Sequence, residues 1–273
     1  MDVNRHIDIM GIVNVTDDSF YAASRCTDAD SVLARISTML EEGADIIDIG
    51  ACSTRPGAAQ VGLEEEWRRM EPVLRAIRAE IPGLRLSIDT YRSEIVRRAY
   101  DTVGKFIVND ISAGSADPGM LPLVGGLGLT YVAMHMRGMP EDMQSMTEYD
   151  DVVADIRRYF EVFSRRAAEN GIKDWILDPG FGFAKTISQN YELLRGLRRL
   201  RDVGTADGNA PRILVGVSRK SMIYKFLGIS PEDSLPATQA LHMTLLYEGA
   251  DVLRVHDVAA AVQTRALYRM SVE

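Results

Sequence analysis

The feature that most constrains this chain is a series of short apolar stretches, each closing on polar residues and separated from the next by a segment of helical periodicity. Eight occur along the 273 residues: Ile7–Val13, Asp45–Gly50, Leu84–Asp89, Lys105–Asp110, Leu129–His135, Asp174–Asp178, Arg212–Ser218 and Asp251–His256. Runs such as Ile213-Leu214-Val215 do not alternate polar with apolar residues, which is typical of strands covered on both faces. The pattern predicts eight strands in a parallel sheet.

The segments between the strands carry the spacing of amphipathic helices. Two series of apolar residues step by three and four positions: Val153, Ile156, Phe160, Phe163 and Ala167, and Trp67, Met70, Leu74, Ile77 and Ile81. We interpret both series as the core-facing sides of helices, with no separate functional role.

Repetition of the strand-helix unit predicts the fold. Glu42-Gly-Ala-Asp45 and Glu248-Gly-Ala-Asp251 each precede a predicted strand, so a glycine ends a helix and an aspartate opens the next strand twice. Eight such units predict an α/β chain folded as a single (β/α)8 TIM barrel over residues 1–273. A doubly wound open sheet is the competing fold, but no G-x-G-x-x-G follows the first strand.

Composition excludes several classes of function. A net charge of −8 argues against a general binder of nucleic acid, which needs an excess of Lys and Arg to neutralise phosphates. No apolar run approaches the ~20 residues of a membrane span. Cys26 and Cys52 form no C-x-x-C pair and the N-terminus lacks a signal-like apolar stretch, so a reducing cytoplasm is expected.

The stretch Asp178–Thr186, DPGFGFAKT, has some features of a phosphate loop. A nucleotide P-loop requires a glycine directly before the lysine, but Ala184 holds that position here. We therefore interpret the stretch as a strand that ends on Asp178 and turns sharply, with Lys185 as a solvated or structural lysine.

Polar residues close all eight predicted strands. They are Asn14, Ser53-Thr54-Arg55, Asp89, Asn109-Asp110, His135, Asp178, Ser218 with Lys220, and Arg254 with His256. A lone aspartate at a strand end more often caps a helix or binds loop amides than acts in a site. Eight polar ends together favour an active site, because a barrel of this kind has its site at the carboxyl ends of the strands.

These residues divide by chemistry into two sets. Asp89, Asn109, Asp178 and Lys220 suit a flat, nitrogen-rich heterocycle, since a carboxylate can accept two parallel N–H bonds. Arg254, His256 and Asn14 become neighbours when the barrel closes, and they suit an anion such as a diphosphate together with a hard metal ion. Two alternatives stay open: Arg254 pairs with Asp257 or a buried carboxylate, and His256 is a structural hydrogen bonder.

At these positions the chain resembles the dihydropteroate synthase family of folate-pathway enzymes. The shared motifs are Met10–Thr16 with Asp18–Phe20, Ser53–Gly57, Ser87–Thr90, Asn109-Asp110, Met134–Met136, Asp178–Phe183, Ser218–Ser221 and Arg254–His256. The resemblance implies an enzyme that condenses 6-hydroxymethyl-7,8-dihydropterin diphosphate with 4-aminobenzoate through a pterin cation, giving dihydropteroate and diphosphate. It also implies Mg²⁺ as cofactor, a homodimer and a target of sulfonamides.

The resemblance further implies a role for each matching residue. The pterin set is Asp89, Asn109, Met134, Asp178, Phe183, Gly216 and Lys220; the diphosphate set is Asn14, Arg254 and His256, with Asn14 also at the metal; the aminobenzoate set is Phe20, Thr54, Arg55, Pro56 and Ser221. Catalysis would rest on Asp89, Asp178, Lys220 and Arg254, because they surround the charges that develop as diphosphate leaves.

The first loop departs from the family pattern. Asp17 stands where a proline is usual, and Ala22-Ala23-Ser24 replace Asp-Gly-Gly; later, Arg137 replaces a frequent glutamine. Two alternatives therefore accompany the synthase interpretation: a catalytically weakened pterin-binding paralogue, and a methyltetrahydrofolate-dependent methyltransferase barrel. The methyltransferase would have no use for the diphosphate set.

Overall fold

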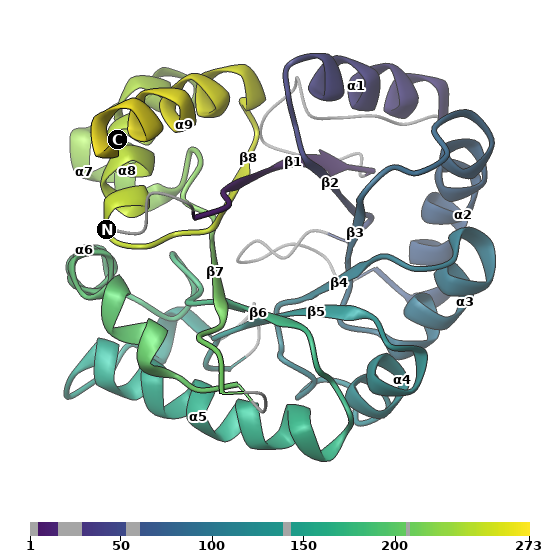
Figure 1. The fold of residues 1–273 in the computed structure, drawn as a ribbon, viewed down its shortest axis with the longest axis horizontal. Helices are drawn as coiled ribbons and strands as arrows, with labels where there is room; N and C mark the ends of the chain where they lie inside the picture. Colours follow the sequence, from purple (N-terminus) through teal and green to yellow (C-terminus); the bar gives the residue numbers. More distant parts are fainter. Residues whose placement is uncertain (1–4, 16–28, 53–60, 139–142, 206–207) are drawn as a thin grey trace.

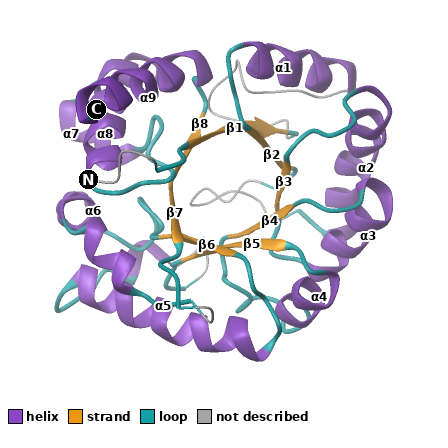
Figure 2. Cartoon of the chain, in the orientation of Figure 1, coloured by secondary structure: helices purple, strands orange, loops and turns teal. Residues whose placement is uncertain are grey.

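The computed structural model describes residues 5–15, 29–52, 61–138, 143–205 and 208–273, and these form a closed barrel of parallel strands in the order β1-β2-β3-β4-β5-β6-β7-β8 (Figures 1 and 2). The strands are β1 Asp8–Asn14, β2 Ile46–Gly50, β3 Leu86–Asp89, β4 Ile107–Asp110, β5 Thr130–Met134, β6 Trp175–Asp178, β7 Arg212–Val215 and β8 Val252–Val255. The predicted (β/α)8 fold is confirmed. The open-sheet alternative is wrong, because β1 pairs with β8 from Asp8↔Val252 to Gly11↔Val255.

Helices surround the strands on the outside of the barrel (Figure 2). They are α1 Ala29–Glu41, α2 Leu63–Glu80, α3 Ser93–Val103, α4 Met120–Leu127, α5 Val152–Glu169, α6 Ile187–Arg195, α7 Ser221–Leu227, α8 Leu235–Tyr247 and α9 Val258–Val272, with short 3-10 helices η2 Met143–Ser145, η3 Leu197–Asp202 and η4 Glu232–Ser234. Two helices, α7 and α8, follow β7, where the repeat predicted one. None of the helices in the described ranges is long and apolar enough to cross a membrane.

The predicted helix stripes face the core. All five residues of the α5 series are buried; in α2, Met70, Leu74 and Ile77 are buried, while Trp67 and Ile81 are partly buried against the core. Phe163 of α5 stacks on Tyr131 of β5 with ring centroids 5.8 Å apart and meets Trp175 of β6 edge to face at 5.0 Å. These contacts fix α5 across the ends of β5 and β6.

The repeated Gly-Ala-Asp segment has a structural reason. Gly43 and Gly249 adopt φ of 97° and 106°, a conformation that ends a helix at little cost only for glycine. The aspartate two residues later then binds a neighbouring strand: Asp45 Oδ2 accepts from the Ile9 amide at 2.7 Å, and Asp251 Oδ2 accepts from the Ile213 amide at 2.8 Å. Each copy therefore joins its own strand to the previous one.

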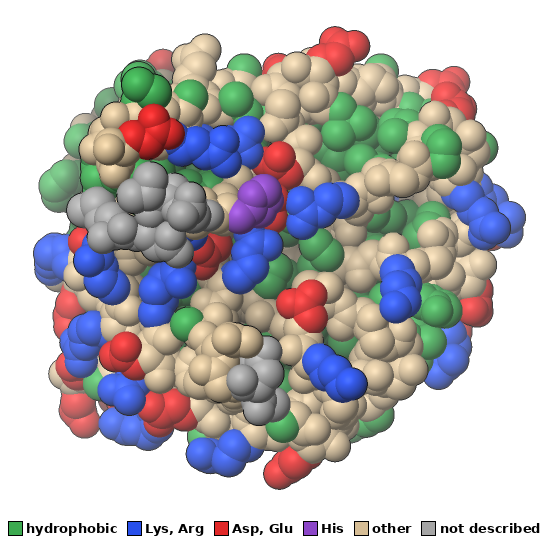
Figure 3. All heavy atoms as spheres, in the orientation of Figure 1, with side chains coloured by type: hydrophobic (Ala, Val, Ile, Leu, Met, Phe, Trp, Pro, Cys, Tyr) green, Lys and Arg blue, Asp and Glu red, His purple; other side chains and the backbone are tan. Residues whose placement is uncertain are grey.

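The interior of the barrel is built in layers. Its middle is apolar, formed by Met10, Ile46, Val132, Ile176, Leu214 and Val252, which pack on one another. At the amino end of the strands, the fully buried carboxylate of Asp8 binds Arg85 and Arg212 at 3.0 and 2.9 Å and His6 at 2.9 Å. Figure 3 looks onto the barrel along the same direction as Figure 1 and shows basic side chains gathered around a histidine near the centre of that face. The opposite, carboxyl end carries the candidate site.

Candidate active site at the carboxyl end of the barrel

Alternation along the strands brings polar residues together above the apolar layer. Side chains two and four positions beyond that layer again face inward, because successive residues of a strand point to opposite faces. These positions are Asn14 on β1, Asp48 and Gly50 on β2, Ser87 and Asp89 on β3, Asn109 on β4, Met134 on β5, Asp178 on β6, Gly216 after β7, and Arg254 and His256 on and after β8. The residues predicted from the strand ends therefore share one inner surface.

Asp48 is the central acceptor of this surface. Its side chain is fully buried and accepts hydrogen bonds from the Ser87 hydroxyl at 2.6 Å, the Asn109 amide at 3.1 Å and Arg254 Nε at 2.7 Å. Asp48 is not among the site residues predicted from the sequence. An available signal was an acidic residue in the middle of the apolar run Ile46–Gly50, since a buried carboxylate requires partners.

Arg254 bridges two carboxylates. Besides Asp48, it reaches Asp89, with Nη2 2.8 Å from Asp89 Oδ2. Of the alternatives for Arg254, pairing with a buried carboxylate is confirmed; Asp257 instead binds Arg219 through two contacts of 2.8 Å. The predicted heterocycle and anion sets are thus joined by a direct ion pair and do not form two separate clusters.

Burial dominates the electrostatics of Asp89. Loss of water raises the pKa of Asp89 to about 7, against the opposing effect of Arg254, and the nearby Asp48 and Glu66 carboxylates raise it further. Gly50 lies level with Asp89 in the β2–β3 register, and a Cβ at that position would come within 3.2 Å of Asp89 Cβ. The glycine leaves room for the Asp89 side chain at the mouth of the barrel.

Asp178 ends β6, and Lys220 follows the neighbouring strand β7. The Gly180 amide donates to Asp178 Oδ1 at 2.8 Å, and Lys220 Nζ donates to the Phe181 carbonyl at 2.6 Å while lying 4.7 Å from the Phe183 ring centroid. Burial raises the pKa of Asp178 and lowers that of Lys220 to about 8, and in each case the opposite charge of the other residue counteracts the shift. A buried carboxylate and a half-buried ammonium with few fixed partners are typical of a ligand site.

The turn after Asp178 depends on glycine. Gly180 has φ of 69°, and a Cβ there would lie 2.1 Å from the His135 carbonyl oxygen, closer than any side chain allows. Gly182 has φ of 82°, and its amide donates to Asn190 Oδ1 at 2.7 Å. The turn can therefore pack against the end of β5, where Met134 lies level with Asp178.

Lys185 is a structural lysine, and its interpretation as solvated is wrong. The residue is only 4% exposed, and its ammonium lies 2.9 Å from the Gly180 carbonyl, 3.0 Å from the Phe183 carbonyl and 3.2 Å from His135 Nδ1. Burial lowers its pKa to about 7, with Asp178 opposing the shift. It binds the turn from the outer side of the barrel. It therefore does not act as the phosphate-binding lysine of a P-loop.

The anion set gathers where β8 meets β1. His256 is half-buried, and its Nδ1 lies 3.1 Å from the Ser218 hydroxyl. Asn14 ends β1 and is also half-buried. Gly216 lies beside this set, since a Cβ there would be 3.8 Å from Arg254 Cβ and 4.0 Å from Lys220 Nζ.

The loop after β7 presents Lys220 through a strained backbone. Arg219 has φ of 53°, which costs free energy for a residue other than glycine. Its guanidinium forms a bidentate pair with Asp257, next to His256, and donates to the Pro231 carbonyl at 3.0 Å. These bonds hold the turn, so that Lys220 points to Phe181 and Ser221 begins α7.

Part of the predicted site lies outside the described residues. This part comprises Phe20, Thr54, Arg55 and Pro56 of the aminobenzoate set, and Asp17, Ala22, Ala23 and Ser24 of the unusual first loop. The described boundary of the second loop is Cys52, whose thiol lies 3.6 Å from Arg92 Nη1. Ser221 is the described member of the aminobenzoate set.

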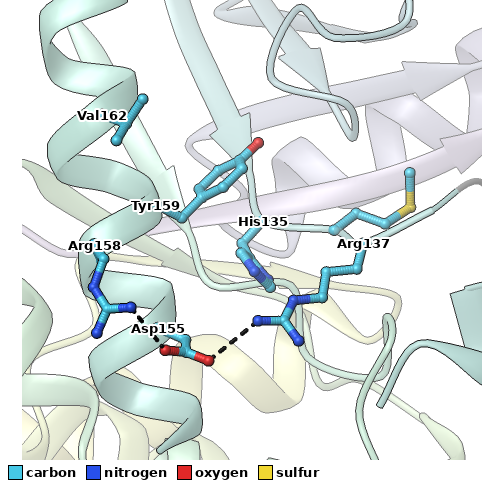
Figure 4. Close-up of a pocket in the computed structure, with 7 residues that line it drawn as sticks. His135, Arg137, Asp155, Arg158, Tyr159 and Val162 are labelled. Carbon is cyan, nitrogen blue, oxygen red and sulfur yellow. Dashed lines mark hydrogen bonds and ion pairs between the residues drawn. The ribbon is translucent and has the colours of Figure 1, made fainter. Parts of the chain in front are cut away.

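A cavity of about 420 Å³ lies on the outer side of β5 and contains none of the inward-facing residues (Figure 4). Its charged groups are already paired: Asp155 binds Arg137 at 3.1 Å and Arg158 at 3.4 Å, and Arg137 also covers the Tyr149 ring at 3.8 Å. The departure at Arg137 therefore alters this outer cavity and not the inner polar surface. We identify the inner surface as the candidate active site.

The fold and this site have clear relatives. A family model described as pterin binding enzyme matches residues 10–256. The chain is 41% identical over 260 residues to dihydropteroate synthase of Escherichia coli (strain K12), covering 94% of this chain and 89% of that protein. It is 40% identical over 258 residues to dihydropteroate synthase of Synechocystis sp., covering 93% and 86%.

Solved structures agree with the sequence relatives. Yersinia pestis dihydropteroate synthase with a sulfonamide drug complex superposes with a TM-score of 0.90 at 36% identity, covering 99% of this chain and 96% of that one. Burkholderia cenocepacia dihydropteroate synthase complexed with 7,8-dihydropteroate gives 0.85 at 35% identity, covering 98% and 92%. The family resemblance predicted from the strand-end motifs is confirmed.

Proposed function

Because this chain belongs to the pterin-binding enzyme family, among the dihydropteroate synthases, we propose that its barrel mouth condenses 6-hydroxymethyl-7,8-dihydropterin diphosphate with 4-aminobenzoate and releases diphosphate. The observation that carries the proposal is the ion pair of Arg254 with Asp89 on the surface that also bears Asp178 and Lys220. This arrangement places a cation for the leaving group beside carboxylates for the heterocycle.

The pterin binds to donors and acceptors whose orientation is set by hydrogen bonds within the protein. The side-chain amide nitrogen of Asn109 donates to Asp48, so the Asn109 amide oxygen is left to accept an N–H of the pterin. Asp178 uses Oδ1 for the Gly180 amide, and we assign Oδ2 to the pterin amino edge. Lys220 donates to a ring acceptor, while Phe183 and Met134 supply apolar walls.

The reaction follows from the placement of charge. As the bond to the diphosphate breaks, negative charge grows on the leaving oxygens and positive charge on the pterin. Arg254 uses Nε and Nη2 for Asp48 and Asp89, so Nη1 is the nitrogen that we assign to the diphosphate, together with His256 and Asn14. Asp178 favours the cation, and the neutral arylamine then attacks it without needing a strong base.

The aminobenzoate half of the site has one described member. Ser221 begins α7 next to Lys220, and we assign its hydroxyl to the aminobenzoate carboxylate. Phe20, Thr54, Arg55 and Pro56 stay predictions for the rest of this pocket. The Xanthomonas albilineans relative, 39% identical with a TM-score of 0.86, was solved with 4-aminobenzoic acid, which supports this substrate class.

We also propose that Mg²⁺ enters with the diphosphate. The described residues contain no group of three or more His, Cys, Asp or Glu side chains arranged to hold a metal ion, and Asn14 offers a single amide oxygen. Mg²⁺ keeps several waters and commonly binds substrate phosphates plus one or two protein oxygens, so this donor set fits an ion carried by the substrate. When bound, it would neutralise charge on the leaving diphosphate.

A homodimer and a cytoplasmic location complete the proposal. Large apolar side chains are exposed at the ends of α7 and α9: Phe226 (65%), Leu227 (48%), Leu267 (64%) and Met270 (73%). Burying them between two copies offers a favourable contact. Sedimentation velocity of the Phe226→Ser, Met270→Ser double variant should show a shift to monomer; a dimer of unchanged stability would place the interface elsewhere.

The test of the reaction is direct. Purified protein is incubated with dihydropterin diphosphate, 4-aminobenzoate and Mg²⁺, and dihydropteroate is measured by mass spectrometry. Lys220→Ala and Arg254→Ala should abolish the product, whereas Arg75→Ala, a control at an exposed arginine of α2, should retain it. Absence of product from the unaltered protein, with the pterin substrate still bound, would indicate the weakened paralogue instead.

A further inference from the structure

Lys185 is a buried lysine whose contacts account for every N–H group of its ammonium. A lysine ammonium carries three N–H donors, and here the three acceptors are the carbonyls of Gly180 and Phe183 and Nδ1 of His135. The side chain is 4% exposed. A buried cation is costly, so retaining one behind the active-site wall calls for an explanation.

The groups that accept from Lys185 belong to the turn after β6 and to the end of β5, next to the proposed pterin site. Gly180 and Phe183 are the first and last residues of a hydrogen-bonded turn, in which the Phe183 amide donates to the Gly180 carbonyl at 3.1 Å. The same turn carries the Phe181 carbonyl that binds Lys220. His135 follows β5 directly, so the ammonium ties the end of β5 to the turn after β6.

Asp178 therefore lies in the field of two lysines, the buried Lys185 and the half-buried Lys220. Lys220 and Lys185 both favour its ionised form, and Asp178 in turn favours the charged form of each. Two other charged groups, Lys220 and Arg137, disfavour the charged form of Lys185. The imidazole of His135 is neutral, because burial holds its pKa well below its usual range. Asp178 is thus the anion that offsets the charge of Lys185.

We propose that Lys185 is a positioning residue for pterin binding: its ammonium holds the Gly180–Phe183 turn against His135 and places a positive charge behind Asp178, whose Oδ1 accepts from the Gly180 amide of that turn, although Lys185 touches no substrate. The inference rests on the proposed pterin role of Asp178 and Lys220. It assigns a function to the lysine of the DPGFGFAKT stretch that neither a nucleotide loop nor a solvated residue explains.

The contact with His135 lets this charge change without loss of geometry. A charged Lys185 donates to Nδ1, with the imidazole proton on Nε2. A neutral Lys185 has a lone pair and can accept from Nδ1–H while still donating to both carbonyls. His135 also lines the outer cavity and faces Tyr159 edge to face at 4.9 Å (Figure 4), so the pair has a route for proton exchange with solvent.

The test compares Lys185→Met with a control, Lys173→Met. Lys173 is an exposed lysine just before β6, the strand that ends on Asp178. At pH 6, Lys185→Met should raise the KM for dihydropterin diphosphate about tenfold, the effect of losing one charge-assisted contact, and leave the KM for 4-aminobenzoate within about twofold. The ratio of pterin KM values between variant and unaltered enzyme should shrink from pH 6 to pH 9, because the unaltered enzyme also loses the charge. Lys173→Met should match the unaltered enzyme throughout.

Several outcomes would overturn the inference. Equal KM changes for both substrates, or a ratio independent of pH, would leave Lys185 a structural residue only. If Lys185→Met does not fold, His135→Leu takes its place: removing one acceptor lowers the affinity of Lys185 for its proton, so the rise in pterin KM should begin at a lower pH than in the unaltered enzyme, and an unshifted profile counts against the proposal. Asp178→Asn tests the proposed pterin site separately from the role of Lys185. Unchanged pterin binding in that variant would refute the site itself.

Discussion

The two ends of the barrel use the same residue types to opposite effect. At the amino end, Asp8 is bound by Arg85 and Arg212; burial alone would raise its pKa, but the two guanidiniums lower it to about 2. At the carboxyl end, Asp48 and Asp89 share the single guanidinium of Arg254, and burial raises the pKa of Asp89 to about 7. The apolar layer of Met10 and its neighbours separates the two ends.

The difference lies in how completely each charge is matched. The amino end pairs its aspartates with several arginines: Asp251 binds Arg201 at 2.6 Å, and Asp45 binds Arg265. Such groups are stable in the absence of a ligand. At the carboxyl end, the side chains of Asp89, Asp178 and Lys220 have one hydrogen-bond partner each among the described residues: Arg254, the Gly180 amide and the Phe181 carbonyl. A ligand with complementary charge can add to these contacts. The charges of the amino end are therefore matched within the protein, whereas those of the carboxyl end leave room for a charged ligand.

The largest effect is expected at Arg254. Arg254→Leu leaves Asp48 and Asp89 buried without their cation, which should lower the free energy of unfolding by about 3–5 kcal/mol and abolish dihydropteroate formation. Urea unfolding and the product assay measure the two effects. Loss of activity with full stability would mean that the two carboxylates become protonated or hydrated in the variant. The two ends would then differ less in how strongly their carboxylates depend on a cation.

A smaller effect, confined to stability, is expected at the amino end. Asp8→Asn removes the acceptor of both guanidinium contacts and should lower the free energy of unfolding by about 2 kcal/mol. The kcat/KM for both substrates should stay within about twofold, because the apolar layer separates Asp8 from the site. A tenfold change in kcat/KM would break the comparison by showing that the two ends are coupled.

The pH dependence of stability should have opposite signs at the two ends. The pKa of Asp8 is depressed in the folded state, so its stabilisation is complete above the unfolded value of 3.8 and is lost as pH falls toward about 2. The pKa of Asp89 is raised, so the folded state binds more protons between pH 3.8 and about 7, and stability falls as pH rises through that range. Urea titrations of Asp8→Asn and Asp89→Asn should each lack the corresponding slope; slopes of equal sign would contradict the assignment.

The smallest effect tests the redundancy of the amino end. Arg85 is half-exposed, and Arg212 also binds Asp8, so Arg85→Gln should cost less than about 1 kcal/mol. Thermal unfolding at low and high salt measures the difference, which should nearly vanish at high salt. A cost equal to that of Asp8→Asn would show that Arg212 does not compensate for its neighbour.

Much of the fold followed from sequence, because strand ends and helix stripes are local patterns. Every observed strand overlaps its predicted stretch, but the ends differ. β1 continues to Asn14, one residue past its predicted end, whereas Gly216–Ser218 were predicted as strand and the β7–β8 pairing stops at Val215↔Leu253. Gly216–Ser218 continue the sequence of β7 without a turn signal, and only the strand pairing shows where the strand ends.

The site was predictable where a side chain lies at a strand end and less so where a pair forms across the barrel. The positions of Asp89, Asn109 and Asp178 at strand ends were predicted, but the partners of their side chains were not. Asp48 lies within a strand, and its partners come from three other strands, so no local pattern reveals it. The burial of Lys185 likewise depends on His135, 50 positions away in the chain.

The four strands that meet at Asp48 also constrain how this protein can change over time. Ser87, Asn109 and Arg254 donate to one carboxylate, so the energetic effects of substitutions at these positions should not add. A substitution tolerated at one of the three alters what the other two can accept. These positions should therefore change together in an evolving lineage or a directed library, with Asp48 deciding which combinations survive.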